Sequence, residues 1–344
     1  MKPNKKTKTA LAALMVLSLL ASPSFAGEQK LINGAGATFP YPIYSKWFSE
    51  YTKVDPSVNF NYQSIGSGGG IKQITAETVD FGASDAALTN EQLRAAPGKL
   101  LHIPMVGGAV AVVFNIEGVR QLNLTPDALA WIYLGKIKKW NDPMIVQDNA
   151  NVALPATDII VVHRSDGSGT SNIFTDYLSS ISNEWQSKVG KGTSVNWPVG
   201  LGGKGNEGVA GLMMQTPGTI GYVELAYAAH NNLAYAALKN KSGKFILPSL
   251  ESTTAAIAGK AATMPSDFRV SIVNSDAPEA YSIAGFTWIL IYKKQNDPFK
   301  GKKVVEFLKW AVHEGQSYTK DLLYAPLPQE VVEKIDQRLL EVTY

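Results

Sequence analysis

A glycine- and hydroxyl-rich segment that follows a basic residue is the part of this sequence best suited to bind an anion. Residues 164–171, RSDGSGTS, place Arg164 close to several glycines and to the hydroxyl groups of Ser168 and Thr170. Glycines let a backbone approach a ligand closely, and a helix that starts at such a turn presents free N–H groups and the positive end of its dipole. The segment therefore predicts an oxyanion site.

Two similar segments lie nearer the N-terminus. Residues 34–39 read GAGATF and residues 66–70 read GSGGG, and each precedes a stretch with helical spacing of apolar residues. Three helix starts of this kind could surround a single oxyanion.

The elements that must position these segments alternate between strand and helix patterns, which predicts an α/β architecture. Residues 58–62 alternate as in a half-buried strand, whereas 106–114 and 159–162 are continuous apolar runs, typical of buried parallel strands. Apolar residues recur at helical spacing over 43–54 and 304–312. Two stretches without a clear strand or helix pattern, 141–157 and 239–263, are predicted to be loops or insertions.

The first 26 residues have the pattern of a secretory signal peptide. Four lysines precede an apolar run over 10–21 and a small-residue stretch that ends at Ala26, after which cleavage is expected. The chain contains no cysteine, so disulfides, a lipidated N-terminal cysteine and thiol chemistry are excluded. A periplasmic location is therefore expected.

Charge and length limit the function classes further. The 344-residue chain has 32 basic and 29 acidic residues, and removing the leader's four lysines leaves 28 basic residues. A nearly neutral chain lacks the basic excess typical of nucleic-acid or anionic-membrane binding, so no nucleic-acid partner is expected. The length suggests about two domains.

Enzyme and cofactor motifs are weak or missing. Residues 200–205, GLGGKG, match the dinucleotide pattern G-x-G-x-x-G but follow no evident strand, so a structural glycine loop is predicted there. There is no nucleotide-binding G-x-x-x-x-G-K-[ST] loop and no G-x-S-x-G nucleophile elbow. The four histidines, His102, His163, His230 and His313, lack metal-ligand spacing. No cofactor, no metal site and no catalytic residue are predicted.

Four motifs in one order carry a resemblance that covers essentially the whole chain after the leader. They are GAGATFP at 34–40, YQSIGSGGG at 62–70, VDFGASD at 79–85 and RSDGSGTS at 164–171. The chain resembles the periplasmic phosphate-binding proteins of bacterial ABC transporters. This resemblance implies the two-lobed type II periplasmic binding fold, with lobe I at 27–107 plus 283–344, lobe II at 108–282, and the ligand cleft between the lobes.

The resemblance also implies a function and a set of site residues. The protein would capture inorganic phosphate and deliver it to membrane permease subunits, without catalysis, and a monomer suits such a shuttle. The family's phosphate ligands correspond to eight positions in this sequence: Thr38, Phe39, Ser67, Asp85, Arg164, Ser168, Gly169 and Thr170. Phe39 and Gly169 would act through their backbone N–H groups, and the hydroxyl side chains would donate.

Two acidic residues have more than one interpretation. Asp166 could orient the Arg164 guanidinium, or it could be a turn or helix-capping residue. The residue types alone favour Asp85 as a structural strand-end residue, whereas the resemblance makes it the acceptor of a phosphate hydrogen. Sulfate, which carries no proton near neutral pH, would leave Asp85 unpaired against a like charge. A sulfate or molybdate binder of the same fold, and a secreted phosphate-handling enzyme, are the alternatives.

Overall fold

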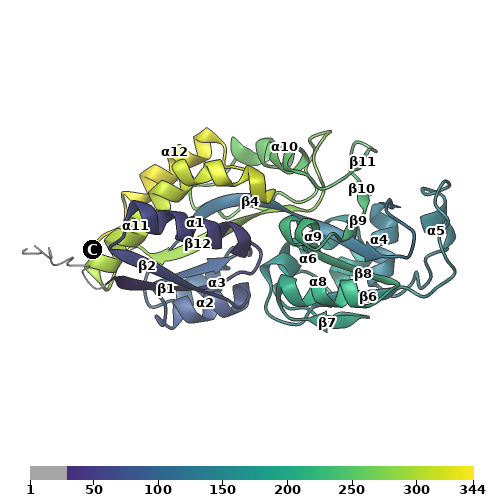
Figure 1. The fold of residues 1–344 in the computed structure, drawn as a ribbon, viewed down its shortest axis with the longest axis horizontal. Helices are drawn as coiled ribbons and strands as arrows, with labels where there is room; N and C mark the ends of the chain where they lie inside the picture. The colour runs from purple at the N-terminus through teal and green to yellow at the C-terminus, as the bar shows by residue number, and fades with distance from the viewer. Residues whose placement is uncertain (1–28) are drawn as a thin grey trace, which may run out of the picture.

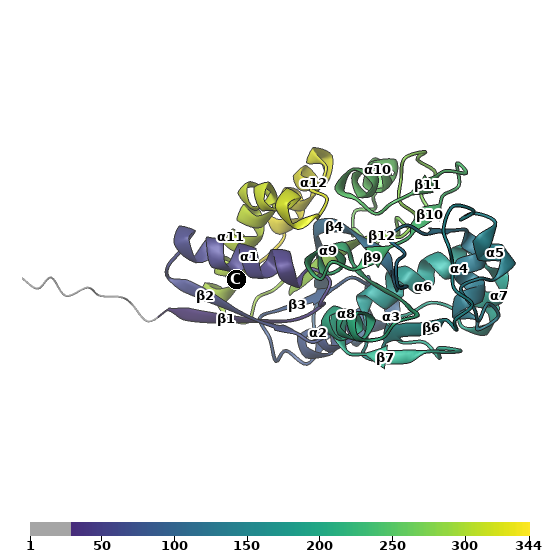
Figure 2. The same ribbon diagram turned by 45° about the vertical axis from the view of Figure 1, so that its right-hand side comes forward.

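The computed structural model describes residues 29–344, and the predicted signal peptide at 1–26 lies outside them. Strands and helices alternate along the chain and form two α/β lobes that lie side by side (Figure 1). A view turned by 45° shows the same two bodies, with β4 passing from one to the other (Figure 2). None of the helices within the described residues is long and apolar enough to span a bilayer.

The first lobe is built from both ends of the chain. Its strands are β1 (Lys30–Gly36), β2 (Val58–Ser64), β3 (Phe81–Ser84), β12 (Ala284–Tyr292) and the first part of β4 (Leu100–Asn115). Its helices are α1 (Tyr41–Val54), α2 (Ser67–Thr75), α3 (Asn90–Ala95), α11 (Pro298–Val312) and α12 (Gln329–Leu339), with two 3₁₀ turns at Glu314–Tyr318 and Lys320–Leu322. β1 pairs in parallel with β2 and β3, whereas β12 runs antiparallel to β3 and β4.

The second lobe comes from the middle of the chain. Its strands are β6 (Ile160–Arg164), β7 (Leu201–Gly203), β8 (Thr219–Glu224) and β9 (Ala234–Tyr235). Its helices are α4 (Pro126–Tyr133), α5 (Pro143–Val146), α6 (Gly169–Ile181), α7 (Asn183–Lys188), α8 (Gly205–Gln215) and α9 (Leu225–His230). A small sheet of β11 (Phe245–Ile246), β10 (Ala237–Lys239) and β5 (Asn123–Leu124) lies beside it, and α10 (Leu250–Ala261) packs against β4.

Strand β4 connects the two lobes. It pairs with β12 up to Ala109 and with β8 from Val110 onward, and the main sheet has the order β2-β1-β3-β12-β4-β8-β6-β7. The lobe boundaries expected near 107/108 and 282/283 stay a prediction.

Local sequence explains the helices that matter for the site. In α1 the buried side chains of Ile43, Trp47 and Tyr51 recur at helical spacing on one face. Helix α6 begins after Ser168, whose hydroxyl accepts the Ser171 N–H at 3.0 Å as an N-terminal cap. The predicted half-buried strand at 58–62 is confirmed as part of β2, which alternates buried and exposed positions at its start.

Two predictions about individual segments are wrong. Residues 106–114 lie in a buried strand, but β4 is antiparallel to β12 and β8, because an apolar run reports burial on both faces and not strand direction. The stretch 239–263 is not a loop throughout, since it contains α10. There Ser249 and Ser252 form a reciprocal cap, and Ala256 and Ile257 supply a buried face that outweighs the hydroxyl-rich composition.

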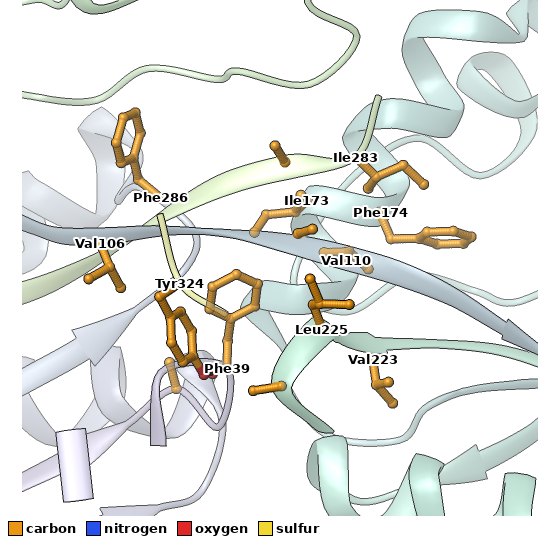
Figure 3. Close-up of a cluster of buried hydrophobic side chains, with 14 of the residues drawn as sticks. Phe39, Val106, Val110, Ile173, Phe174, Val223, Leu225, Ile283, Phe286 and Tyr324 are labelled. Carbon is orange, nitrogen blue, oxygen red and sulfur yellow. Dashed lines mark hydrogen bonds between the residues drawn. The ribbon is translucent and has the colours of Figure 1, made fainter. Parts of the chain in front are cut away.

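The core is continuous where the lobes meet. Figure 3 shows Val106 and Val110 of β4 lying among buried side chains contributed by both lobes: Phe39, Tyr324, Phe286, Ile283, Ile173, Phe174, Val223 and Leu225. Each fully buried side chain of this size stabilises the fold by about 1.5–3 kcal/mol. The Tyr324 hydroxyl also donates to the Phe39 carbonyl oxygen at 2.6 Å, so the C-terminal region holds the segment that leads into α1.

Candidate functional site

The starts of α2 and α6 face each other across the two lobes. The Gly68 N–H donates to the Gly167 carbonyl oxygen at 2.8 Å. A Cβ atom added at Gly169 would lie 2.6 Å from the Cβ of Asp85 and would also meet the Ser67 hydroxyl oxygen. Glycine is therefore required at position 169 for this approach, and the predicted residues Ser67, Asp85 and Gly169 are in one place.

The positive charge of the site comes from Arg164, which forms a buried ion pair with Asp166. The Arg164 Nε and Nη2 atoms donate to the two carboxylate oxygens of Asp166 at 2.7 and 2.6 Å. The Arg164 side chain is only 1 % exposed and that of Asp166 is 12 % exposed. This two-pronged contact fixes the guanidinium plane and leaves the Nη1 side for other acceptors. Of the two interpretations of Asp166, the structure favours the one in which it orients Arg164.

The charge state of Asp166 follows from these contacts. Partial burial acts to raise its pKa, but the hydrogen bonds and charge of Arg164, together with the Gly205 N–H, outweigh burial and hold the pKa below its ordinary value. Asp166 is thus ionised at neutral pH.

A chain of hydrogen bonds joins four side chains from both lobes. Arg164 Nη1 donates to the Thr170 hydroxyl oxygen at 3.2 Å, and Asn206 Nδ2 donates to the same oxygen at 3.2 Å. The Asn206 amide also donates to the hydroxyl oxygen of Thr38, at 2.7 Å. Two of the predicted hydroxyl donors, one in each lobe, are thereby connected through Asn206.

Asp85 is the buried acid of the site. Its Oδ1 atom has no hydrogen-bond partner among the described residues, and its Oδ2 atom lies 3.4 Å from the Ser67 hydroxyl. Burial raises the pKa of Asp85 to about 7, although the hydroxyl of Thr287, the charge of Arg164 and the hydroxyl of Ser67 act in the opposite direction. Asp85 is therefore a buried group that can accept or donate a proton near neutral pH.

The remaining predicted residues are buried beside these groups. Ser168 caps α6, so its hydroxyl oxygen accepts from the Ser171 N–H and keeps its own hydrogen for another acceptor. The ring of Phe39 packs edge-on against Tyr324, which agrees with the expectation that Phe39 would act through its backbone.

Sequence reasoning missed three polar residues around the site. Asn206 stands directly after the glycine stretch 200–205, and Thr287 lies on β12 close enough to affect the Asp85 pKa. Burial raises the pKa of Glu224 well above its usual range and so favours the uncharged form of this acid, which does not repel an anion. Nothing local in the sequence marks Thr287 or Glu224, because each is brought close to the site by the sheet.

The glycine stretch at 200–205 contains a short strand that the sequence pattern does not indicate. It lies on a strand-to-helix turn, since β7 ends at Gly203 and α8 begins at Gly205. In the described part of the chain no strand leads directly into Gly200, as predicted, because β7 lies within the glycine stretch, and its three residues leave no apolar pattern in the sequence. The Gly205 N–H donates to Asp166 at 3.0 Å, so the turn supports the ion pair.

One pocket borders the predicted site, and a larger pocket does not. One, of about 460 Å³, has Asp85 in its wall and lies between residues of both lobes, including Ile71, Ile173 and Gly285. A larger one, of about 920 Å³, is lined by residues of the second lobe and the adjoining small sheet and contains none of the predicted residues. Charge, donors and burial, rather than volume, identify an oxyanion site. Within residues 29–344, no three His, Asp or Glu side chains are grouped to hold a metal ion.

Comparison with known proteins agrees with this geometry. Residues 21–314 match the PBP superfamily domain. The chain is 46 % identical over 325 residues to the phosphate-binding protein PstS of Pasteurella multocida, covering 94 % of each chain, and 47 % identical over 306 residues to that of Haemophilus influenzae, covering 88 % and 91 %. The chain belongs to the PstS family of the PBP superfamily.

The solved structures extend the likeness to the fold. A high-affinity periplasmic phosphate-binding protein with phosphate bound superposes with a TM-score of 0.70 at 22 % identity, covering 89 % of this chain and 93 % of the other. The predicted two-lobed type II periplasmic binding fold is confirmed. The PstS relatives are named as binding proteins and not as enzymes, in agreement with the prediction that this chain is not an enzyme.

Proposed function

We propose that the protein is a periplasmic receptor that encloses inorganic phosphate between its lobes and delivers it to the permease of an ABC transporter. The ligands are the hydroxyls of Thr38, Ser67, Ser168 and Thr170, the backbone N–H groups of Phe39 and Gly169, the Arg164 guanidinium and the Asp85 carboxyl group. The observation that carries the proposal is a buried carboxyl group, Asp85, in a site otherwise made of donors and one buried arginine.

This combination selects for an anion that brings its own proton. A doubly charged hydrogen phosphate offers one O–H group, which Asp85 can accept, and three oxygens for the donors. Sulfate offers four acceptors and would place an ionised oxygen against the Asp85 carboxylate, at a large cost in a buried site. The names of the PstS relatives support the choice of phosphate.

Closure of the lobes around the anion gives the protein a transport role. Hydrogen bonds between lobes, such as Gly68 to Gly167 and Asn206 to Thr38, form only when the lobes are together. A bound anion that contacts both lobes shifts the hinge equilibrium toward this closed form, which a permease can distinguish from the open form. A cleaved leader at 1–26, a periplasmic location and a monomeric state fit this role.

The proposal is tested by calorimetric titration of residues 27–344, freed of bound anion by unfolding and refolding. At about pH 8 we expect phosphate to bind with a Kd of about 1 μM or lower, and sulfate at least about a thousandfold more weakly. Tight binding of sulfate or molybdate would make the protein a receptor for another oxyanion. Turnover of a phosphomonoester would instead favour the enzyme hypothesis.

Replacement of Gly169 by alanine tests the tight contact between the lobes. The added Cβ would lie 2.6 Å from the Cβ of Asp85, so Gly169→Ala should weaken phosphate binding at least about fivefold, as an overpacked contact costs roughly 1–3 kcal/mol. Gly211→Ala is the matched control, because Gly211 also lies in a helix but has no atom within 4 Å of an added Cβ. Equal phosphate affinities for the two variants would contradict closure at Gly169.

A further inference from the structure

Asn206 lies between two hydroxyl groups that the proposed function assigns to phosphate. It is fully buried at the start of α8, in the second lobe. Its amide nitrogen donates to the Thr38 hydroxyl oxygen at 2.7 Å and to the Thr170 hydroxyl oxygen at 3.2 Å. Both hydrogens of the amide group are therefore used.

The orientation of the Asn206 amide is fixed from the other side. Its Oδ1 atom accepts the backbone N–H of Glu224 at 2.9 Å. A flipped amide would set its NH₂ group against that N–H and its oxygen between the two hydroxyls, so only one orientation satisfies all three contacts. The side chain thus presents donors, and no acceptor, to Thr38 and Thr170.

The two hydroxyl oxygens have no accepting capacity left. A hydroxyl group has one hydrogen to donate and two lone pairs to accept with. Thr38 Oγ1 accepts from both the backbone N–H and the side chain of Asn206, and Thr170 Oγ1 accepts from Asn206 and from Arg164 Nη1. Neither hydroxyl donates to another group among the described residues. Each can therefore act only as a donor toward a bound ligand.

We propose that Asn206 is a positioning residue that holds the hydroxyls of Thr38 and Thr170 as hydrogen-bond donors toward the bound anion. Because Asn206 leaves both hydroxyls able only to donate, Asp85 is the group that accepts a ligand hydrogen. Because Thr38 is in the first lobe and Asn206 in the second, the Thr38 hydroxyl acquires this fixed direction only when the lobes close. This role rests on the proposed phosphate site.

A mutant cycle measured by phosphate titration tests the proposal. Asn206→Ala should weaken phosphate binding by about 10- to 100-fold in the otherwise unchanged protein, because two charge-assisted contacts lose their orientation. In a protein that carries Thr38→Val and Thr170→Val, the same change should cost less than about threefold, because no hydroxyl remains to be oriented.

Controls separate orientation from a general structural effect. Asn149 is a second buried asparagine with one accepted and two donated hydrogen bonds, all to backbone groups of the second lobe, and Asn149→Ala should leave phosphate affinity within about twofold. Asn206→Ser, which keeps a small polar group, replaces the alanine variant if that variant does not fold, and the same coupling is expected.

The outcomes distinguish the two proposals. If Asn206→Ala weakens phosphate binding by the same factor in both backgrounds, or in neither, the positioning role is overturned. Phosphate binding by the wild-type protein would still support the proposed function. A wild-type protein that does not bind phosphate would overturn the proposed function, and with it the role of Asn206 toward phosphate.

Discussion

Asp85→Asn should remove most of the protein's preference for phosphate over sulfate. The asparagine amide can still accept the phosphate hydrogen through its oxygen, so phosphate affinity should change by no more than about tenfold. It can also turn its NH₂ group toward a fully deprotonated oxygen, and sulfate affinity at about pH 8 should rise at least about a hundredfold, since like charges juxtaposed in a buried site cost several kcal/mol. Competitive calorimetric titration measures both values.

The pH dependence of sulfate binding should also distinguish the wild-type protein from the Asp85→Asn variant. Burial raises the pKa of Asp85 to about 7, and once protonated the group donates to sulfate instead of repelling it. Above this pH, each bound sulfate requires uptake of a proton, so wild-type sulfate affinity should fall about tenfold per pH unit. The Asp85→Asn protein should show no such slope. A wild-type protein with pH-independent rejection of sulfate would contradict the role of Asp85.

Loss of stability does not account for these expected effects. The Asp85 pKa is higher in the folded protein than its ordinary value of 3.8, so the folded state favours the protonated form. Protonation of Asp85 therefore contributes its full stabilisation to the folded state below about pH 4, and this contribution is lost as the pH rises to about 7. Asparagine carries no charge to bury, so in phosphate-free buffer at about pH 8 the variant should unfold at the same or a higher temperature than wild type.

Arg164→Gln should abolish phosphate binding at micromolar concentrations. The change removes the buried positive charge and leaves the partly buried Asp166 carboxylate without its partner, so the site becomes net negative. Truncating one member of a buried, hydrogen-bonded charge pair costs about 2–5 kcal/mol or more, so the phosphate Kd should rise at least about thirtyfold.

Arg269→Gln is the matched control for this change. Arg269 also pairs with a nearby aspartate, Asp267, at 2.8 Å, and it borders the pocket that has Asp85 in its wall, but its side chain is 25 % exposed. Screening by solvent makes such a pair worth little, so phosphate affinity should change by less than about threefold. Similar losses in the two variants would mean that general charge, and not the oriented Arg164 guanidinium, attracts the anion.

Local rules for turns and helix starts predict an anion site most directly in the contiguous segment 164–171, with its arginine, glycines and helix start. The other ligand positions are predicted from the family resemblance: Thr38, Phe39, Ser67 and Asp85. The sequence leaves the role of Asp166 open between two interpretations. The helix predicted from apolar spacing over 43–54 is confirmed as part of α1, because its apolar face packs on the sheet.

The contacts between distant segments could not be predicted in the same way. Thr38 and Asn206 are 168 residues apart, and their hydrogen bond depends on how the lobes close. The antiparallel direction of β4 depends on its partners, since its buried side chains would look the same in either direction. The raised pKa of Asp85 depends on burial contributed by both lobes.

A crystal structure of the protein with phosphate is the measurement to make. We expect one phosphate oxygen at about 2.5–2.7 Å from an Asp85 carboxyl oxygen, the short distance of a charge-assisted O–H···O contact, with the Arg164 guanidinium on a second oxygen. The hydroxyls of Thr38 and Thr170 should donate to the anion while they accept from Asn206. Phosphate bound elsewhere, or bound without contact to Asp85 and Arg164, would contradict the proposed site.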